Sequence, residues 1–245
     1  MTASTACLGH PRIGVERELK RACEAFWAGR LTAEQLQGVG RELRARHWLA
    51  MKTAGIQHIP SNDFSFYDHM LDTAVMVGAV PARYRPIDEP LARTFAMARG
   101  LQDSARGLDV GALEMTKWFD TNYHYLVPEL ERGQAFALDA GKVLSEVRQA
   151  RALGIETRPV IVGPVTFLML SKAAAPATAL ESVDALVPVY EQLLTTLAAE
   201  GVAWVQLDEP GLTLDLDAPT REAFRWALRR LSSVPTRPRL MLCTY

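Results

Sequence analysis

The spacing of hydrophobic residues predicts two consecutive helices near the start of the chain. The first covers residues 15–29, and its apolar face collects Leu19, Ala22, Cys23, Phe26 and Trp27. The second covers residues 32–53, where Thr32 and Gln35 form a capping-box pattern at the start and Gly55 provides a stop at the end. Together they predict an αα-hairpin that precedes the first clear strand.

Farther along the chain, short apolar runs alternate with helical patterns. Strands are predicted at residues 56–59, 158–162, 203–207 and 239–243, the first of them ended by Pro60. Helices are predicted at residues 139–153 and 183–200 and from Pro219 onward. Residues 80–112 show little periodicity and predict a loop with a short helix. The alternation predicts an α/β fold with a parallel sheet.

Composition narrows the class of protein. The 245 residues are 49% hydrophobic, and 27 Lys and Arg balance 28 Asp and Glu, so no charged field points to nucleic acid or a membrane surface. The cysteines, Cys7, Cys23 and Cys243, are too far apart for a disulfide framework, and no signal peptide is visible. We therefore expect a cytoplasmic protein that does not cross a membrane. The five histidines show no metal-ligand spacing, so no metal site is predicted.

Residues 114–125, EMTKWFDTNYHY, combine four aromatic rings with several polar side chains. Lys117, Asn122 and His124 lie in this stretch. Burying unpaired polar groups is unfavourable, so a core strand is rarely this polar. Rings that provide contact area, beside polar groups that fix orientation, are typical of the wall of a ligand site. The alternative interpretation is a strand with one face in water.

Asp208 and Glu209 stand where a predicted parallel strand ends, and active sites of β/α barrels lie at that edge. Because neighbouring residues on a strand face opposite sides, we expect one carboxylate to face a ligand and the other to cap a helix or pair with an arginine. A purely structural role is the alternative. A hydrolase would need a second carboxylate across the cleft, and Asp63 is the candidate.

The first helix opens with the cationic side chains of Arg17 and Lys20. Cations at a helix N-terminus oppose the macrodipole, unless an anion is bound there. Free backbone N–H groups of the first turn would help to hold a carboxylate or phosphate. The alternative is a charged turn that is simply solvated.

Six segments, taken in order, carry a resemblance to a known family. They are GHPRIG (9–14), RELK (17–20), NDFSFYDH (62–69), EMTKWFDTNYHY (114–125), GPVTF (163–167) and WVQLDEP (204–210). Together they resemble the N-terminal domain of cobalamin-independent methionine synthase. Two positions depart from the family pattern, namely His10, where an aromatic residue is usual, and Gly211, where alanine is usual.

The resemblance implies an enzyme of two (β/α)8 barrels that transfers a methyl group from 5-methyltetrahydropteroyltriglutamate to homocysteine, forming methionine. It implies that the positions of Arg17, Glu18, Leu19, Lys20 and Lys117 contact the folate. Zinc, the homocysteine site and the proton-donating histidine belong to the family's C-terminal barrel. We therefore expect no catalytic residue and no cofactor in this chain. Side chains expected to line an additional part of the cleft are Asp63, Asn122, His124, Asp208 and Glu209.

The length of the chain differs from what the family implies. Strands near residues 7, 56, 123, 160, 205 and 240 amount to about six, whereas a closed barrel has eight. The expectation is one domain over residues 1–245: an incomplete TIM-type barrel with an N-terminal αα-hairpin insertion, from a truncated enzyme that is inactive alone. The alternatives are a non-catalytic folate- or anion-binding module and one half of a split enzyme. Unpaired edge strands predict self-association.

Overall fold

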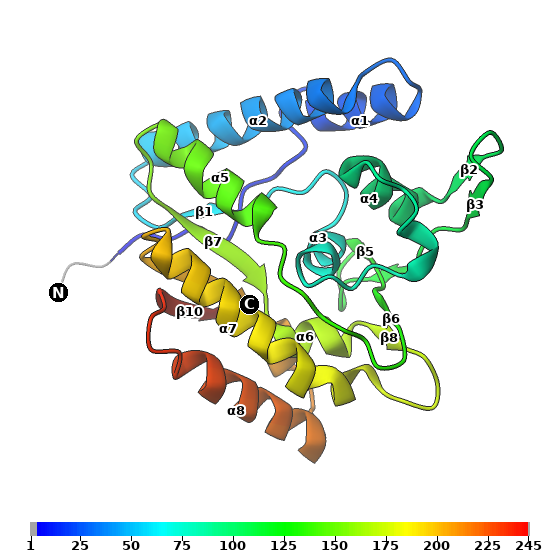
Figure 1. The fold of residues 1–245 in the computed structure, drawn as a ribbon. Helices are drawn as coiled ribbons and strands as arrows, with labels where there is room; N and C mark the ends of the chain where they lie inside the picture. Colours follow the sequence, from blue (N-terminus) through cyan, green and yellow to red (C-terminus); the bar gives the residue numbers. More distant parts are fainter. Residues whose placement is uncertain (1–3, 245) are drawn as a thin grey trace.

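The predicted helical hairpin is present in the computed structural model, which describes residues 4–244 (Figure 1). Helix α1 spans Glu18–Trp27 and helix α2 spans Ala33–Thr53. The Thr32 hydroxyl accepts a hydrogen bond from the Gln35 amide at 3.2 Å, and the Gln35 side chain accepts one from the Thr32 amide at 2.8 Å. The predicted capping box is therefore confirmed.

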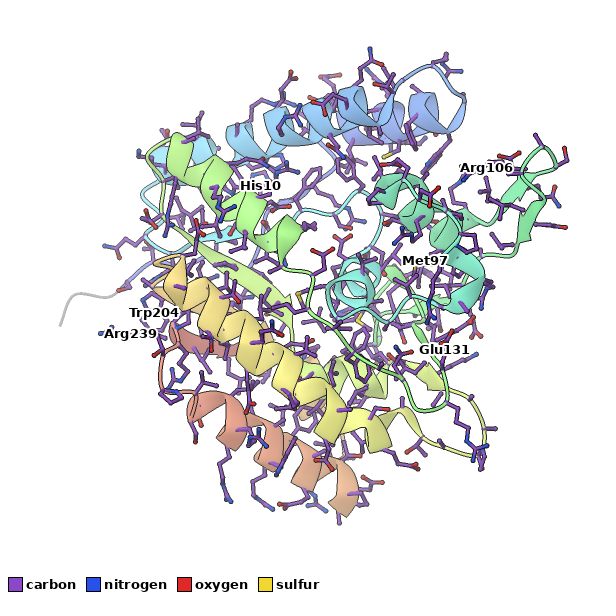
Figure 2. The ribbon with its side chains drawn as sticks, viewed as in Figure 1. His10, Met97, Arg106, Glu131, Trp204 and Arg239 are labelled. Atoms are coloured by element: carbon purple, nitrogen blue, oxygen red, sulfur yellow. The ribbon has the colours of Figure 1, made fainter. Side chains whose placement is uncertain are left out.

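A parallel sheet lies at the centre of the fold. Within residues 4–244 it has four strands in the order β1 (Ile59–Ser61), β7 (Thr157–Val162), β9 (Trp204–Asp208) and β10 (Arg239–Cys243). The register sets Arg239 opposite Trp204, and the guanidinium lies 5.5 Å from the indole ring centre (Figure 2). The predicted α/β class and parallel pairing are confirmed.

The first sheet strand differs from its prediction. We expected a strand at residues 56–59 ended by Pro60, but Pro60 lies inside β1. A central strand bonds to neighbours on both sides, and proline lacks an N–H for those bonds. Because β1 is the outermost strand in the sheet order, it can accommodate Pro60. The strand expected near Cys7 is reduced to one parallel bridge between Ala6 and His58.

Helices α5 (Gly141–Ala152), α7 (Val183–Ala199) and α8 (Ala218–Ser232) lie along one side of the sheet (Figure 1). They follow the predicted ranges closely. Short elements α6 (Pro164–Met169), η2 (Ala179–Ser182) and η3 (Pro210–Thr213) join strands to helices. The largest buried apolar cluster lies between these helices and the sheet, and it includes Ile161, Leu186, Tyr190, Leu197 and Val205.

The segment between β1 and α5 contains more regular structure than its sequence predicted. It forms α3 (His69–Met76), η1 (Ala82–Tyr84) and α4 (Pro90–Arg99). Antiparallel pairs follow, first β2 (Leu101–Asp103) with β3 (Leu108–Val110), and then β4 (Met115–Lys117) with β5 (His124–Leu126). Strand β6 (Glu129–Leu130) pairs in parallel with β8 (Lys172–Ala173).

The strand expected near Tyr123 is therefore not a strand of the central sheet. It belongs to the β4–β5 hairpin, because the Trp118 amide donates a hydrogen bond to the Tyr123 carbonyl at 2.7 Å and closes a tight turn. Phe119 takes a left-handed conformation in this turn, with φ of 49°. So short a connection allows only antiparallel pairing, since a parallel strand needs a crossover of a dozen residues or more.

A buried arginine ties the strands together on their other side. Arg158 of β7 is 1% exposed, and its Nη2 donates to the Cys7 carbonyl at 2.7 Å and to Gln206 Oε1 of β9 at 2.5 Å. Its Nη1 donates to the His58 carbonyl at 3.3 Å. One side chain thus joins the N-terminal segment, the approach to β1, and β9.

No helix within residues 4–244 combines the length and the apolar character needed to cross a bilayer.

Candidate functional site

Three of the segments that carry the family resemblance meet around the β4–β5 hairpin. The sequence predicted that residues 114–125 form either the wall of a ligand site or a strand with one face in water. In the structure they form a hairpin with some side chains in the core and others in solvent. Trp118 and Tyr125 are buried, whereas Lys117, Asn122 and His124 are exposed. The hairpin therefore presents its polar side chains to solvent while its rings anchor it in the core.

Arg12 joins this hairpin to the segment that precedes α1. Its Nη2 donates to the Tyr67 carbonyl, and its Nη1 donates to the Tyr123 hydroxyl at 3.4 Å. The guanidinium carbon also lies 5.6 Å from the centre of the Tyr123 ring, within the range of a cation–π contact. Arg12 thus contacts both of the other segments.

Asp68 anchors the same meeting point from the start of α3. Its Oδ1 accepts a hydrogen bond from the Tyr123 hydroxyl at 2.9 Å. Its Oδ2 accepts bonds from the Leu71 amide at 3.0 Å and the Leu126 amide at 3.1 Å. Burial raises the pKa of Asp68, while these hydrogen bonds act in the opposite direction. Asp68 therefore caps α3 and fixes β5 with one carboxylate.

His69 lies between two rings of the hairpin. Its ring meets Trp118 edge-on at 4.5 Å and stacks on Tyr123 at 5.5 Å. Burial lowers the pKa of His69 to about 4, and burial raises the pKa of Tyr123 to about 12. Both groups are therefore uncharged at neutral pH, where they can donate or accept hydrogen bonds without carrying charge.

The four residues at the start of α1 that were expected to contact the folate differ in burial and in their partners. Arg17 is the residue before the helix, in a left-handed conformation with φ of 58°. Glu18 accepts a hydrogen bond from Arg46 Nη2 at 2.7 Å, which lowers the pKa of Glu18. Leu19 is 3% exposed and packs in the core. Lys20 is exposed and lies 3.5 Å from the Glu24 carboxylate.

No hydrogen bond or ion pair within residues 4–244 joins Arg17 or Lys20 directly to Lys117. The link between their segments runs through Arg12, which lies in the loop before α1 and contacts the hairpin that carries Lys117. Lys117 stands opposite His124 in the register of that hairpin. His124 Nδ1 in turn lies 3.1 Å from the Asn122 carbonyl.

One of the two carboxylates at the end of β9 takes the capping role that the sequence predicted. Glu209 is fully buried and accepts hydrogen bonds from the amides of Val165 at 3.2 Å and Thr166 at 2.8 Å. It therefore caps α6, as one of the two was expected to do, although burial raises the pKa of Glu209 to about 7. Asp208 accepts a hydrogen bond from Gln206 at 2.6 Å, and burial raises the pKa of Asp208 to about 6.

Asp63 follows β1 at the same edge of the parallel sheet. Its Oδ2 accepts a hydrogen bond from the His10 amide at 2.8 Å, and burial raises the pKa of Asp63. His10 replaces an aromatic residue of the family pattern, and its ring stacks on His47 with ring centres 4.0 Å apart. His10 thus makes an aromatic stacking contact at this position.

Sequence reasoning placed Arg12, Asp68 and His69 inside the resembling segments but did not single them out. Their contacts with Tyr123 join residues more than fifty positions apart, so spacing alone gives no signal for the contacts. Among residues 4–244, no group of three or more His, Cys, Asp or Glu is placed to hold a metal ion.

Comparison with known families decides the relationship. The family model for the N-terminal domain of cobalamin-independent synthase matches residues 4–245. The chain belongs to this family. The resemblance inferred from the six segments is therefore confirmed, and an unrelated hydrolase built on Asp208 or Glu209 is excluded.

Relatives carry the name 5-methyltetrahydropteroyltriglutamate–homocysteine methyltransferase. One from Xylella fastidiosa strain 9a5c is 57% identical over 240 residues, covering 97% of this chain and 31% of the relative. One from Caulobacter vibrioides is 52% identical over 263 residues, covering 100% and 34%. One from Mycobacterium tuberculosis is 49% identical over 238 residues, covering 97% and 31%. The chain spans about a third of the length of these relatives.

Proposed function

We propose that this chain holds the polyglutamate tail of a methyl-carrying folate, as the N-terminal domain of a methionine-forming methyltransferase. The relatives are named for methyl transfer between 5-methyltetrahydropteroyltriglutamate and homocysteine, which supports that reaction here. A triglutamate tail is a row of carboxylates, and Arg and Lys are its natural partners. In this proposal, Arg17, Lys20 and Lys117 bind the tail.

Glu18 and Leu19 have supporting roles in the same proposal. Leu19 is buried, so it would meet the folate through its backbone, and its side chain holds α1 against the core. Glu18 is occupied by Arg46, and this pair fixes the first turn. Asp63, Asn122, His124 and Asp208 are proposed to line the rest of the cleft, whereas Glu209 supports it by capping α6.

The contact of Arg12 with Tyr123 is the observation that carries the proposal. It connects the loop that leads into Arg17 and Lys20 with the hairpin that carries Lys117. Two cationic segments that are about a hundred residues apart are thereby held by one structural link, and an extended polyanion is the kind of ligand that needs both.

The family's architecture extends the proposal. We place the parallel sheet in an incomplete (β/α)8 barrel that forms a single domain, the N-terminal one of two. Zinc would activate the homocysteine thiol by lowering its pKa, and homocysteine would bind with it in the C-terminal domain. In the described part of the chain, residues 4–244, no group of three or more His, Cys, Asp or Glu is placed to hold a metal ion. In this proposal the zinc ligands and the catalytic residues belong to the C-terminal domain.

Isothermal titration calorimetry with the triglutamate and monoglutamate forms of 5-methyltetrahydrofolate tests the binding role. We expect tighter binding of the triglutamate, and a loss of roughly tenfold or more when Arg17, Lys20 and Lys117 are replaced together by alanine. Lys52→Ala, which removes an exposed lysine near the end of α2, is the control and should bind as the wild type does. Unchanged binding in the triple variant would contradict the proposal.

An activity assay distinguishes an enzyme domain from a binding module. The purified chain alone should form no methionine from the folate donor and homocysteine. If the chain acts as one half of a split enzyme, adding a polypeptide that corresponds to the rest of the relatives should give turnover. Turnover by the chain alone would contradict the assignment of catalysis to the other domain.

A further inference from the structure

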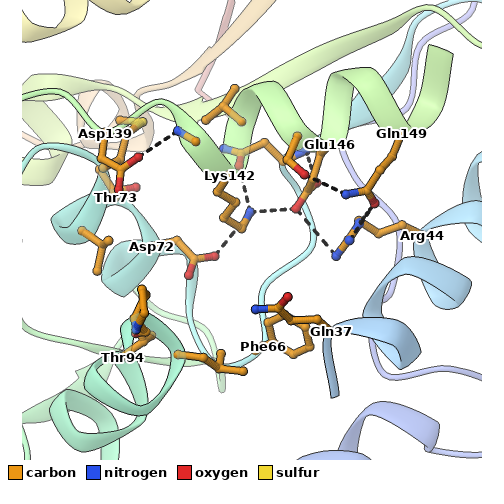
Figure 3. A pocket seen from close by; sticks show the side chains of 18 of the residues that line it. Gln37, Arg44, Phe66, Asp72, Thr73, Thr94, Asp139, Lys142, Glu146 and Gln149 are labelled. Carbon is orange, nitrogen blue, oxygen red and sulfur yellow. Dashed lines mark hydrogen bonds and ion pairs between the residues drawn. The ribbon is translucent and has the colours of Figure 1, made fainter. Parts of the chain in front are cut away.

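A separate pocket of about 410 Å³, lined by both charged and apolar side chains, lies between α2, α3, α4 and α5 (Figure 3). Its lining, drawn from residues 4–244, includes none of Arg17, Lys20 and Lys117, so it is distinct from the proposed folate site. Small-molecule pockets occupy roughly 300–1,000 Å³, and this volume is near the lower limit. A pocket of this volume has room for a small molecule, and a single amino acid fits within it.

The innermost charges of the pocket neutralise each other. Lys142 Nζ of α5 lies 3.1 Å from Glu146 Oε1 and donates a hydrogen bond to Asn62 Oδ1 at 2.8 Å. Glu146 is 2% exposed and also accepts a bond from the Asn62 amide at 2.8 Å. This pair is satisfied within the protein, so it shapes the pocket without requiring a ligand.

Arg44 provides free donors at one side. It is 8% exposed, and its Nε and Nη2 both donate to Gln149 Oε1, at 3.2 and 2.8 Å. Its Nη1 has no hydrogen-bond acceptor among residues 4–244 and lies 3.9 Å from Glu146 Oε1, beyond hydrogen-bond distance. The side-chain amide of Gln37, also in the lining, has no hydrogen-bond partner in the same part of the chain. A carboxylate would satisfy both groups.

Acidic side chains lie on the opposite side. Figure 3 shows Asp72 and Asp139 across the pocket from Arg44 and Gln149, with Lys142 and Glu146 between them. Asp72 Oδ2 lies 3.5 Å from Lys142 Nζ, a loose pairing that leaves room for a closer cation. Apolar side chains complete the wall, namely Phe66, Val75, Met76, Leu91 and Ile161.

We propose that this pocket binds a free α-amino acid with an apolar side chain. Its carboxylate would accept hydrogen bonds from Arg44 Nη1 and Gln37, its ammonium group would pair with Asp72, and its side chain would contact Phe66 and Leu91. A zwitterion offers a partner to both sides at once: its carboxylate faces Arg44 Nη1, and its ammonium group is a second cation for Asp72, which lies 3.5 Å from Lys142 Nζ. This proposal does not depend on the folate-binding proposal.

Calorimetry on the complete chain tests the ligand class, with L-leucine and L-methionine as probes. We expect saturable binding of one equivalent at millimolar or lower concentration. Isocaproate, which lacks the ammonium group of leucine, and isoamylamine, which lacks its carboxylate, should each bind roughly tenfold or more weakly. Equal binding of isocaproate and leucine, or no binding of any amino acid, would overturn the proposal.

Two variants locate the site. Thr94 lines the pocket on α4, and its hydroxyl donates to the Pro90 carbonyl at 2.9 Å. Thr195 on α7 makes the same helical contact with the Glu191 carbonyl at 3.0 Å, but it is exposed and outside the pocket. Thr94→Trp should fill the pocket and abolish binding, while Thr195→Trp should preserve it. Binding that survives Thr94→Trp would contradict the assignment.

A charge variant tests the ammonium contact. Asp72→Asn keeps the size of the side chain and removes its charge, so leucine should bind roughly tenfold more weakly while isocaproate binds as before. Equal binding of leucine by this variant and the wild type would overturn the role of Asp72. Lys117→Ala should leave leucine binding unchanged, which separates this pocket from the proposed folate site.

Discussion

The Tyr123 hydroxyl donates a hydrogen bond to the buried Asp68 carboxylate at 2.9 Å, joining the β4–β5 hairpin to the start of α3. The same hydroxyl receives the Arg12 contact, so this bond lies where three separate segments meet. Because Asp68 also holds two backbone amides, the tyrosine completes a carboxylate that is otherwise only partly satisfied.

Tyr123→Phe should therefore destabilise the protein by about 1.5–3 kcal/mol, the usual contribution of a hydrogen bond to a charged group. Tyr125→Phe is the matched control, since its hydroxyl donates to the neutral Leu170 carbonyl at 3.1 Å. Its loss should cost about 1 kcal/mol. Urea unfolding of both variants measures the two losses of unfolding free energy. Equal losses would show that the hydrogen bond to Asp68 stabilises the protein no more than the bond to a neutral carbonyl does.

His69 should make stability depend on pH. Its folded-state pKa of about 4 lies below the ordinary value of 6.5, so the unfolded chain binds a proton in this interval and the folded protein does not. Stability from this group is complete above the ordinary pKa and is lost as the pH falls toward the folded pKa.

His69→Phe keeps a ring against Trp118 and removes the titration. When the pH falls from about 7.5 to about 5, the wild type should lose about 2 kcal/mol more unfolding free energy than the variant does. Other titrating groups, including His47, are present in both proteins and cancel in the comparison. Urea titrations at both pH values measure it, and a constant difference would contradict the assigned pKa shift.

Gly163 should tolerate no side chain. A Cβ at this position would overlap the Glu209 carboxylate that caps α6, although the φ of −70° is acceptable for any residue. Gly163→Ala should cost about 1–3 kcal/mol or more, as overpacked sites do. At Gly111 an added Cβ meets nothing within 4 Å, so Gly111→Ala is the control. Thermal unfolding compares them, and equal melting temperatures would rule out the clash.

The outer edge of β10 should promote self-association. This strand is at the end of the sheet order, and Leu242 on it is 45% exposed. An exposed edge with an apolar side chain can pair with another chain. Sedimentation velocity should show concentration-dependent association that Leu242→Lys reduces, whereas Leu153→Lys, at a residue 38% exposed after α5, should not. A monomer at all concentrations would contradict this prediction.

Local patterns predicted much of the fold. The strand at residues 239–243 was placed without error, and the Thr32 capping box was found because both partners are three residues apart. The capping role of one residue of the Asp208–Glu209 pair followed from the alternation of side chains along a strand. These features depend on neighbours in sequence, which explains why they were accessible.

Features that depend on distant partners were not predictable. The hairpin turn requires a left-handed Phe119, and an aromatic residue gives no sign of that conformation. Lys142, Asn62 and Glu146 form their network across α5 and the loop after β1, at separations of about eighty residues. Arg12 was not singled out from the sequence, because nothing in its own segment identifies Tyr123 as its partner.

The hydrogen bond from Arg158 to the Cys7 carbonyl joins residues 151 positions apart. During synthesis this hydrogen bond cannot form until the chain has been made as far as Arg158. Closing so long a loop is unfavourable in entropy and slows folding. The contacts between α1 and α2 are local in the sequence, so this pair of helices can form on the nascent chain before α2 makes its contacts with β1 and α5, which need residues farther along the chain.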